Sequence, residues 1–147
     1  MDKMIIAIDP GAGGGFACRD TDGRVWVDNM PDTMTGIWSY FASLEPEAIA
    51  IMEDVGHSFP GNAAKASTTF AKHVGHLEMA LYGAGISCQK VAPGVWMKAL
   101  GTWPKDKKER KKAIQEAMQR LYPSLKVTLK VSDALGILTY FLKNKNA

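Results

Sequence analysis

Residues 4–15, which read MIIAIDPGAGGG, join a short apolar run to a carboxylate and a glycine-rich turn. The run at residues 4–8 is apolar throughout, which is typical of a strand buried on both faces of a sheet. Asp9 ends that strand, and the glycines after it allow backbone to approach a phosphate closely. The stretch therefore indicates a metal or phosphate site, although an Asp ahead of Gly is equally ordinary in a turn.

A second carboxylate follows another apolar strand. Residues 48–52 read AIAIM and are followed by Glu53 and Asp54. A helical pattern at residues 35–44 separates the two strands, which predicts a crossover and parallel pairing. The carboxyl ends of neighbouring parallel strands lie about 5 Å apart, so Asp9 and Glu53 are expected at the same edge of the sheet.

The remaining pattern predicts an α/β fold. Short strands at 16–18 and 25–27 flank an Asp-Gly hairpin turn, and they extend the first strand into an antiparallel meander. We also predict a helix at 63–82, a strand at 86–91, a helical turn at 96–100, and helices at 107–121 and 132–142, the last with Ser132 as N-cap and Asp133 in its first turn. The result is a mixed five-stranded sheet with helices on both faces, forming a single domain over residues 1–147.

Composition narrows the class of protein. The 147 residues are 46% hydrophobic and 22% charged, as in ordinary globular proteins, and no run approaches the roughly 20 apolar residues of a membrane span. Residues 1–30 have no secretory signal pattern, so we expect a cytoplasmic protein without membrane contact. Cys18 and Cys88 lie in apolar segments without CxxC spacing, which predicts two buried thiols.

Positive charge is concentrated in one segment. The net charge is only +3, yet six of the eight residues at 105–112 are basic. Such a segment can contact a polyanion, or it can simply be the solvated start of a helix.

Five segments in this order resemble the RuvC-type Holliday junction resolvases, a family with the RNase H-like fold. They are residues 5–11 (IIAIDPG), 50–55 (AIMEDV), 63–75, 91–98 (VAPGVWMK) and 132–138 (SDALGIL). The resemblance implies a homodimeric endonuclease that cuts four-way DNA junctions by paired nicks. It implies no small-molecule cofactor, only Mg²⁺ with Mn²⁺ as a possible substitute, two ions in each active site.

The resemblance also implies residue roles. Asp9, Glu53 and Asp133 match the metal-binding, catalytic acids of the family, and Phe59 matches an aromatic wedge at the junction centre. The implied DNA contacts are basic residues: Lys98, Lys105, Lys107, Lys108, Arg110, Lys111, Lys112 and Lys130. His57 is a further candidate for a phosphate or water contact.

Lys130 is also a departure from the family, which commonly carries an acid three residues before the final Asp. The second ion is then held by Asp9, Asp133, water and phosphate, or by another ligand such as Asp54. Lys130 itself is an alternative contact to phosphate. Three other functions stay open: a nuclease for structured RNA or RNA/DNA, a catalytically weak junction-binding protein, and a phosphate-binding module of the actin-like ATPase type. The alanine-rich start of the helix at 63–82 is a candidate dimer surface.

Overall fold

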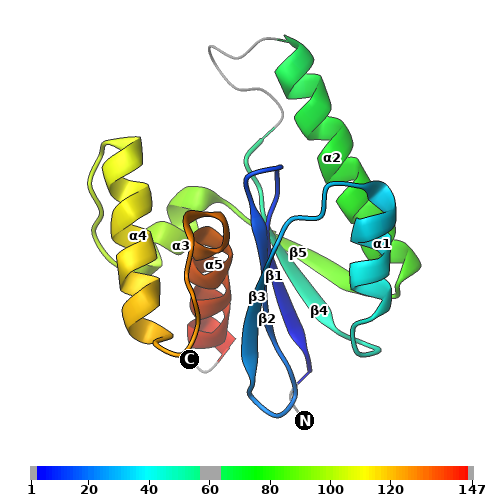
Figure 1. The fold of residues 1–147 in the computed structure, drawn as a ribbon, viewed down its shortest axis with the longest axis horizontal. Coiled ribbons are helices and arrows are strands. Elements are labelled where there is room, and N and C mark those ends of the chain that lie inside the picture. The colour runs from blue at the N-terminus through cyan, green and yellow to red at the C-terminus, as the bar shows by residue number, and fades with distance from the viewer. Residues whose placement is uncertain (1–2, 57–63, 146–147) are drawn as a thin grey trace.

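A computed structural model describes residues 3–56 and 64–145 of the chain. Its sheet has the strand order β3-β2-β1-β4-β5 (Figure 1). The strands are β1 (Ile5–Asp9), β2 (Gly15–Arg19), β3 (Val25–Asn29), β4 (Ile49–Glu53) and β5 (Ser87–Val91). Pairing is antiparallel between β1, β2 and β3 and parallel between β1, β4 and β5. The predicted mixed five-stranded sheet, an antiparallel meander continued by crossover strands, is therefore confirmed.

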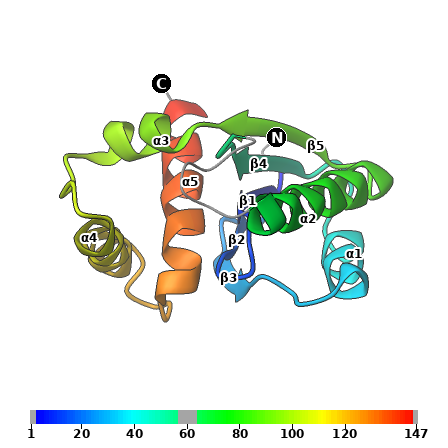
Figure 2. The ribbon, with the colours of Figure 1, turned by 90° about the horizontal axis from the view of Figure 1, so that it is seen from above.

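Helices cover both faces of this sheet, as Figure 2 shows from above. The helices α1 (Met34–Ala42) and α2 (Ala64–Gly83) lie on one face, and α3 (Pro93–Leu100), α4 (Lys107–Leu121) and α5 (Leu129–Lys145) lie on the other. The short α3 begins three residues earlier than predicted, because Pro93 suits the first helical position, where no backbone N–H is needed. Within the described residues, none of the helices has the length and apolar character that crossing a bilayer requires.

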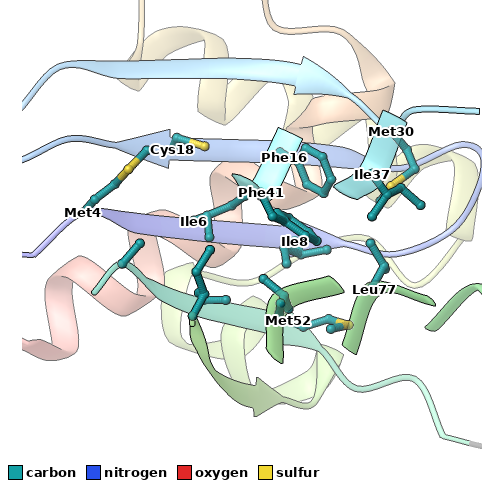
Figure 3. Packing of buried hydrophobic residues seen from close by; sticks show 14 residues of the cluster. Met4, Ile6, Ile8, Phe16, Cys18, Met30, Ile37, Phe41, Met52 and Leu77 are labelled. Carbon is teal, nitrogen blue, oxygen red and sulfur yellow. The ribbon is translucent and has the colours of Figure 1, made fainter. Parts of the chain in front are cut away.

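The alternation of side chains along the strands divides the interior into two cores. On one face, Ile6, Ile8 and Phe16 pack toward Phe41 of α1 and Leu77 of α2 (Figure 3). On the other face, the odd-numbered positions of β1 and β4 pack against α3, α4 and α5. Asp9 and Glu53 continue this odd-numbered series, so both carboxylates are directed to the α5 side of the sheet.

Two sequence predictions are corrected by the structure. Cys18 is buried as expected, but Cys88 is exposed, because β5 is an edge strand whose first four residues face solvent. Ser132 is not an N-cap: α5 begins at Leu129, and the backbone N–H groups of Val131 and Ser132 donate to the Thr128 carbonyl oxygen. Asp133 therefore lies beyond the first turn of α5, within the part of the helix that packs on the sheet.

Candidate active site

The structure brings Asp9, Glu53 and Asp133 together at the carboxyl edge of β1 and β4. Ile8 pairs with Met52 in the parallel ladder, so Asp9 and Glu53 end adjacent strands side by side. Asp133 reaches the same edge from α5, which packs on β1 and β2. Both other acids raise the pKa of Asp9 by charge repulsion, so the three carboxylates form one electrostatic cluster.

Asp9 is held by the glycine turn that follows it. The carboxylate is only 8% exposed, and burial, then Asp133, then Glu53 raise its pKa to about 8, while Lys111 lowers it. The turn closes through the Gly14 N–H, which donates to the Gly11 carbonyl oxygen at 3.0 Å. A Cβ at Gly14 would overlap the Asp9 backbone carbonyl and lie 3.2 Å from its Cγ. Gly14 is thus needed because backbone and carboxylate both occupy that space.

Glu53 is fixed by an aromatic partner that the sequence did not reveal. Trp96 of α3 is fully buried, and its Nε1–H donates to Glu53 Oε2 at 2.7 Å. The indole lies against Gly136 of α5, where a Cβ would overlap the ring. Burial raises the pKa of Glu53, the Trp96 hydrogen bond opposes this, and Asp133 raises the pKa further. The sequence offered one indication of this pair: Trp96 lies in an apolar segment, and a buried indole N–H requires a hydrogen-bond acceptor.

Asp133 is paired with a lysine of the neighbouring helix. Lys111 Nζ of α4 lies 3.3 Å from Asp133 Oδ2. The other oxygen, Asp133 Oδ1, is buried and has no hydrogen-bond partner within residues 3–56 and 64–145. Lys111, predicted as a contact to DNA, therefore lies against the acidic cluster in this structure.

A pocket of about 210 Å³ lies beside these acids. Glu53 and Asp133 line one part of it, and Lys107, Arg110 and Lys111 of α4 line another. Carboxylates attract a cation, and the ammonium and guanidinium groups attract an anion. The pocket can therefore take a phosphate group together with a cation.

Of the other predicted basic residues, Lys107 and Arg110 line this pocket. Lys98, Lys105, Lys107, Lys108, Lys112 and Lys130 are exposed. Arg110 is half-buried and donates to the Lys105 carbonyl oxygen at 2.9 Å. Asp54, the alternative ligand, is exposed and accepts from the Gly56 N–H in a turn. Phe59 and His57 lie outside the described residues.

The donors present suit a hard divalent cation. All three acids offer carboxylate oxygens, and the unpartnered Asp133 Oδ1 and the mutual repulsion of the acids are both relieved by a cation. In the part of the chain that the structure describes, no three His, Cys, Asp or Glu side chains are close enough to ligate one ion together. Trp96 and Lys111 each hold one of these carboxylates on a protein donor in this structure.

Solved structures of known proteins share the fold of this chain. Over 97% of this chain and 96% of the other, a structure of RuvC from Thermus thermophilus matches with a TM-score of 0.58 and 16% sequence identity. The chain has the RuvC-type resolvase fold. A structure of T. thermophilus RuvC in complex with a Holliday junction substrate matches with a TM-score of 0.62, at 15% identity and 96% coverage of both chains. No family model and no curated protein sequence matches the chain.

The acids of this RuvC-type fold are expected to make stability depend on pH. The ordinary pKa of Asp is 3.8 and that of folded Asp9 is about 8, so between these values the folded state binds more protons than the unfolded state. In EDTA, the free energy of unfolding should fall by a few kcal/mol as pH rises from about 4 to 8, with Glu53 acting in the same direction. Urea unfolding at several pH values measures this, and Asp9→Asn should flatten the profile. If the free energy of unfolding depended on pH equally in wild type and Asp9→Asn, the raised pKa would not belong to Asp9.

Trp96→Phe is expected to raise the pKa of Glu53 further. The phenyl ring retains packing against Gly136 but has no N–H to stabilise the ionised carboxylate. Carboxyl-carbon NMR titration of labelled glutamate measures the shift. Trp103→Phe is the matched control, because Trp103 Nε1–H donates to the Met97 carbonyl oxygen instead. Equal Glu53 titration in wild type and Trp96→Phe would show that the hydrogen bond has no electrostatic role.

Proposed function

We propose that this chain is a metal-dependent endonuclease that resolves Holliday junctions. The observation that supports this most directly is the cluster of three coupled carboxylates beside a basic pocket, in a chain with the RuvC-type fold. The junction in one of the matching RuvC structures supports branched DNA as the class of substrate. The proposed catalytic residues are Asp9, Glu53 and Asp133.

The same three acids would hold Mg²⁺, or Mn²⁺ in its place, with two ions bound in each active site. Bound Mg²⁺ supplies Lewis-acid activation of water and charge compensation at the phosphodiester. Burial favours the protonated form of Asp9 at neutral pH, and a bound cation would stabilise its ionised form. Trp96 orients Glu53, and Lys107 and Arg110 are positioned at the pocket to bind a phosphate oxygen.

The remaining basic side chains would bind the DNA arms. We propose this role for Lys98, Lys105, Lys108, Lys112 and Lys130, which are exposed and so available to phosphates, and Phe59 stays a candidate for the junction centre. A symmetric junction suits two copies of the chain related by a two-fold axis. The exposed alanines at positions 64, 66 and 71 of α2 are the proposed contact between them.

Cleavage of a labelled four-way junction tests the function. The junction is compared with a linear duplex of the same sequence and with a hybrid RNA/DNA duplex, each in Mg²⁺ and in EDTA. We expect paired, symmetric nicks in the junction alone, and only with Mg²⁺. Binding of the junction without nicks would instead identify a junction-binding protein, and cleavage of the hybrid in preference to the junction would identify an RNA-directed nuclease.

A further inference from the structure

We propose that Lys111 acts as an internal counter-ion of the three carboxylates, and that a divalent cation binds only when the Lys111 ammonium leaves Asp133. Lys111 would then set the metal affinity of the site. This inference rests on the proposed function, because it assumes that the acids hold a metal.

The position of Lys111 distinguishes it from the other basic residues of α4. Its Nζ lies 3.3 Å from Asp133 Oδ2, and α4 packs along α5, so the helix itself brings the ammonium to the cluster. Lys108 and Lys112, its neighbours on the same helix, are exposed, and no ion pair links either to an acid among the described residues. Among the described residues, Lys111 is therefore the one lysine of residues 105–112 that forms an ion pair with an acid.

The ammonium acts on the whole cluster. Besides contacting Asp133, Lys111 lowers the pKa of both Asp9 and Glu53 by its charge. It is thus one positive charge shared by three acids, in a site where burial makes uncompensated negative charge costly. A divalent cation at Asp133 would likewise act on all three acids through its charge.

A divalent ion and the ammonium would compete for Asp133 Oδ2. An ion bound to Asp133 Oδ2 would lie within a few ångströms of the ammonium, and like charges at that distance repel strongly at low dielectric. Asp133 Oδ1, buried and without a partner among the described residues, shows that the lysine satisfies only one side of this carboxylate. The acid therefore retains capacity for a ligand that contacts more of it.

The lysine can leave without rearranging the fold. Its side chain is 35% exposed, compared with 13% for Asp133, so it already borders solvent. A lysine has a flexible four-carbon stem that can move the ammonium outward while α4 stays in place. The exchange of one cation for another thus needs only side-chain rotation.

Mn²⁺ binding without DNA tests this exchange. The bound ion is followed by electron paramagnetic resonance under argon at about pH 8.5, where protons compete less for the carboxylates than at neutral pH. We expect Lys111→Ala and the near-isosteric Lys111→Met to bind Mn²⁺ about tenfold more tightly than wild type. Lys112→Ala, which removes the same charge from the next exposed position, should leave the affinity unchanged. Circular dichroism verifies folding of each variant.

The outcomes separate the two proposals. If Asp9→Asn abolishes Mn²⁺ binding but both Lys111 variants bind as wild type or more weakly, the counter-ion role is overturned and the metal site is retained. Equal tightening by Lys111→Ala and Lys112→Ala would also overturn it, since the effect would then come from overall charge. If neither wild type nor the Lys111 variants bind Mn²⁺ in a way that depends on Asp9, both this inference and the proposed function fail.

Discussion

Asp9→Asn is expected to lower the rate of junction nicking about a thousandfold in saturating Mg²⁺. The amide keeps the shape of the side chain and removes the charge that a cation needs, and the loss of several kcal/mol of metal-derived stabilisation corresponds to this factor. Single-turnover nicking of the labelled junction measures it. Junction binding should remain close to that of wild type, because DNA affinity is proposed to come from the basic residues.

Two further variants sharpen this experiment. Asp22→Asn removes an exposed acid in the hairpin turn between β2 and β3, and it should nick as wild type does. Asp54→Asn distinguishes the sources of a second metal: a loss as large as that of Asp9→Asn would make Asp54 a ligand, although it is exposed and accepts from Gly56 here. Nicking by Asp9→Asn within tenfold of wild type would refute its catalytic assignment.

Gly14→Ala is expected to destabilise the protein by about 3 kcal/mol or more and to reduce nicking. The added methyl group would overlap the Asp9 backbone carbonyl, and backbone on both sides of the turn cannot move aside as a flexible side chain would. Asp9 would also be displaced, because its Cγ lies 3.2 Å from the same position. Urea unfolding at pH 5, where Asp9 is protonated, separates the steric effect from charge.

Gly13→Ala provides the comparison one residue earlier in the same turn. No heavy atom outside its chain neighbours lies within 4 Å of a Cβ at Gly13. Alanine there should change the free energy of unfolding little, or raise it slightly by restricting the unfolded chain. Similar losses in both variants would indicate that the turn as a whole resists substitution, and not that Gly14 packs against Asp9.

The sequence predicted the sheet well because its signals are local. Apolar runs mark β1 and β4 as buried, and the acids directly after them fall at one edge as soon as a crossover makes the strands parallel. The exposure of Cys88 was missed because it depends on strand order: the position of β5 at the edge is a property of the whole sheet, not of its own residues.

The partners of the acids could not be read from sequence for a different reason. Lys111 lies in a run of similar charges, and its contact with Asp133 depends on how α4 is rotated against α5. Trp96 contacts Glu53 because Gly136, forty residues later, leaves room for its ring. Ser132 has the side chain of an N-cap, yet helix α5 begins about one turn earlier, where the Thr128 carbonyl oxygen accepts from the backbone N–H groups of Val131 and Ser132.

The unequal environments of the two thiols have a practical consequence. Burial raises the pKa of both thiols, that of Cys18 to about 12, but Cys18 is shielded from solvent whereas Cys88 is exposed on the outer strand. A maleimide dye should therefore attach at one position without prior mutagenesis. That position lies on the margin of the sheet, so a fluorophore on Cys88 and another on a DNA arm would form an energy-transfer pair that tests whether single junctions are bound and released as proposed.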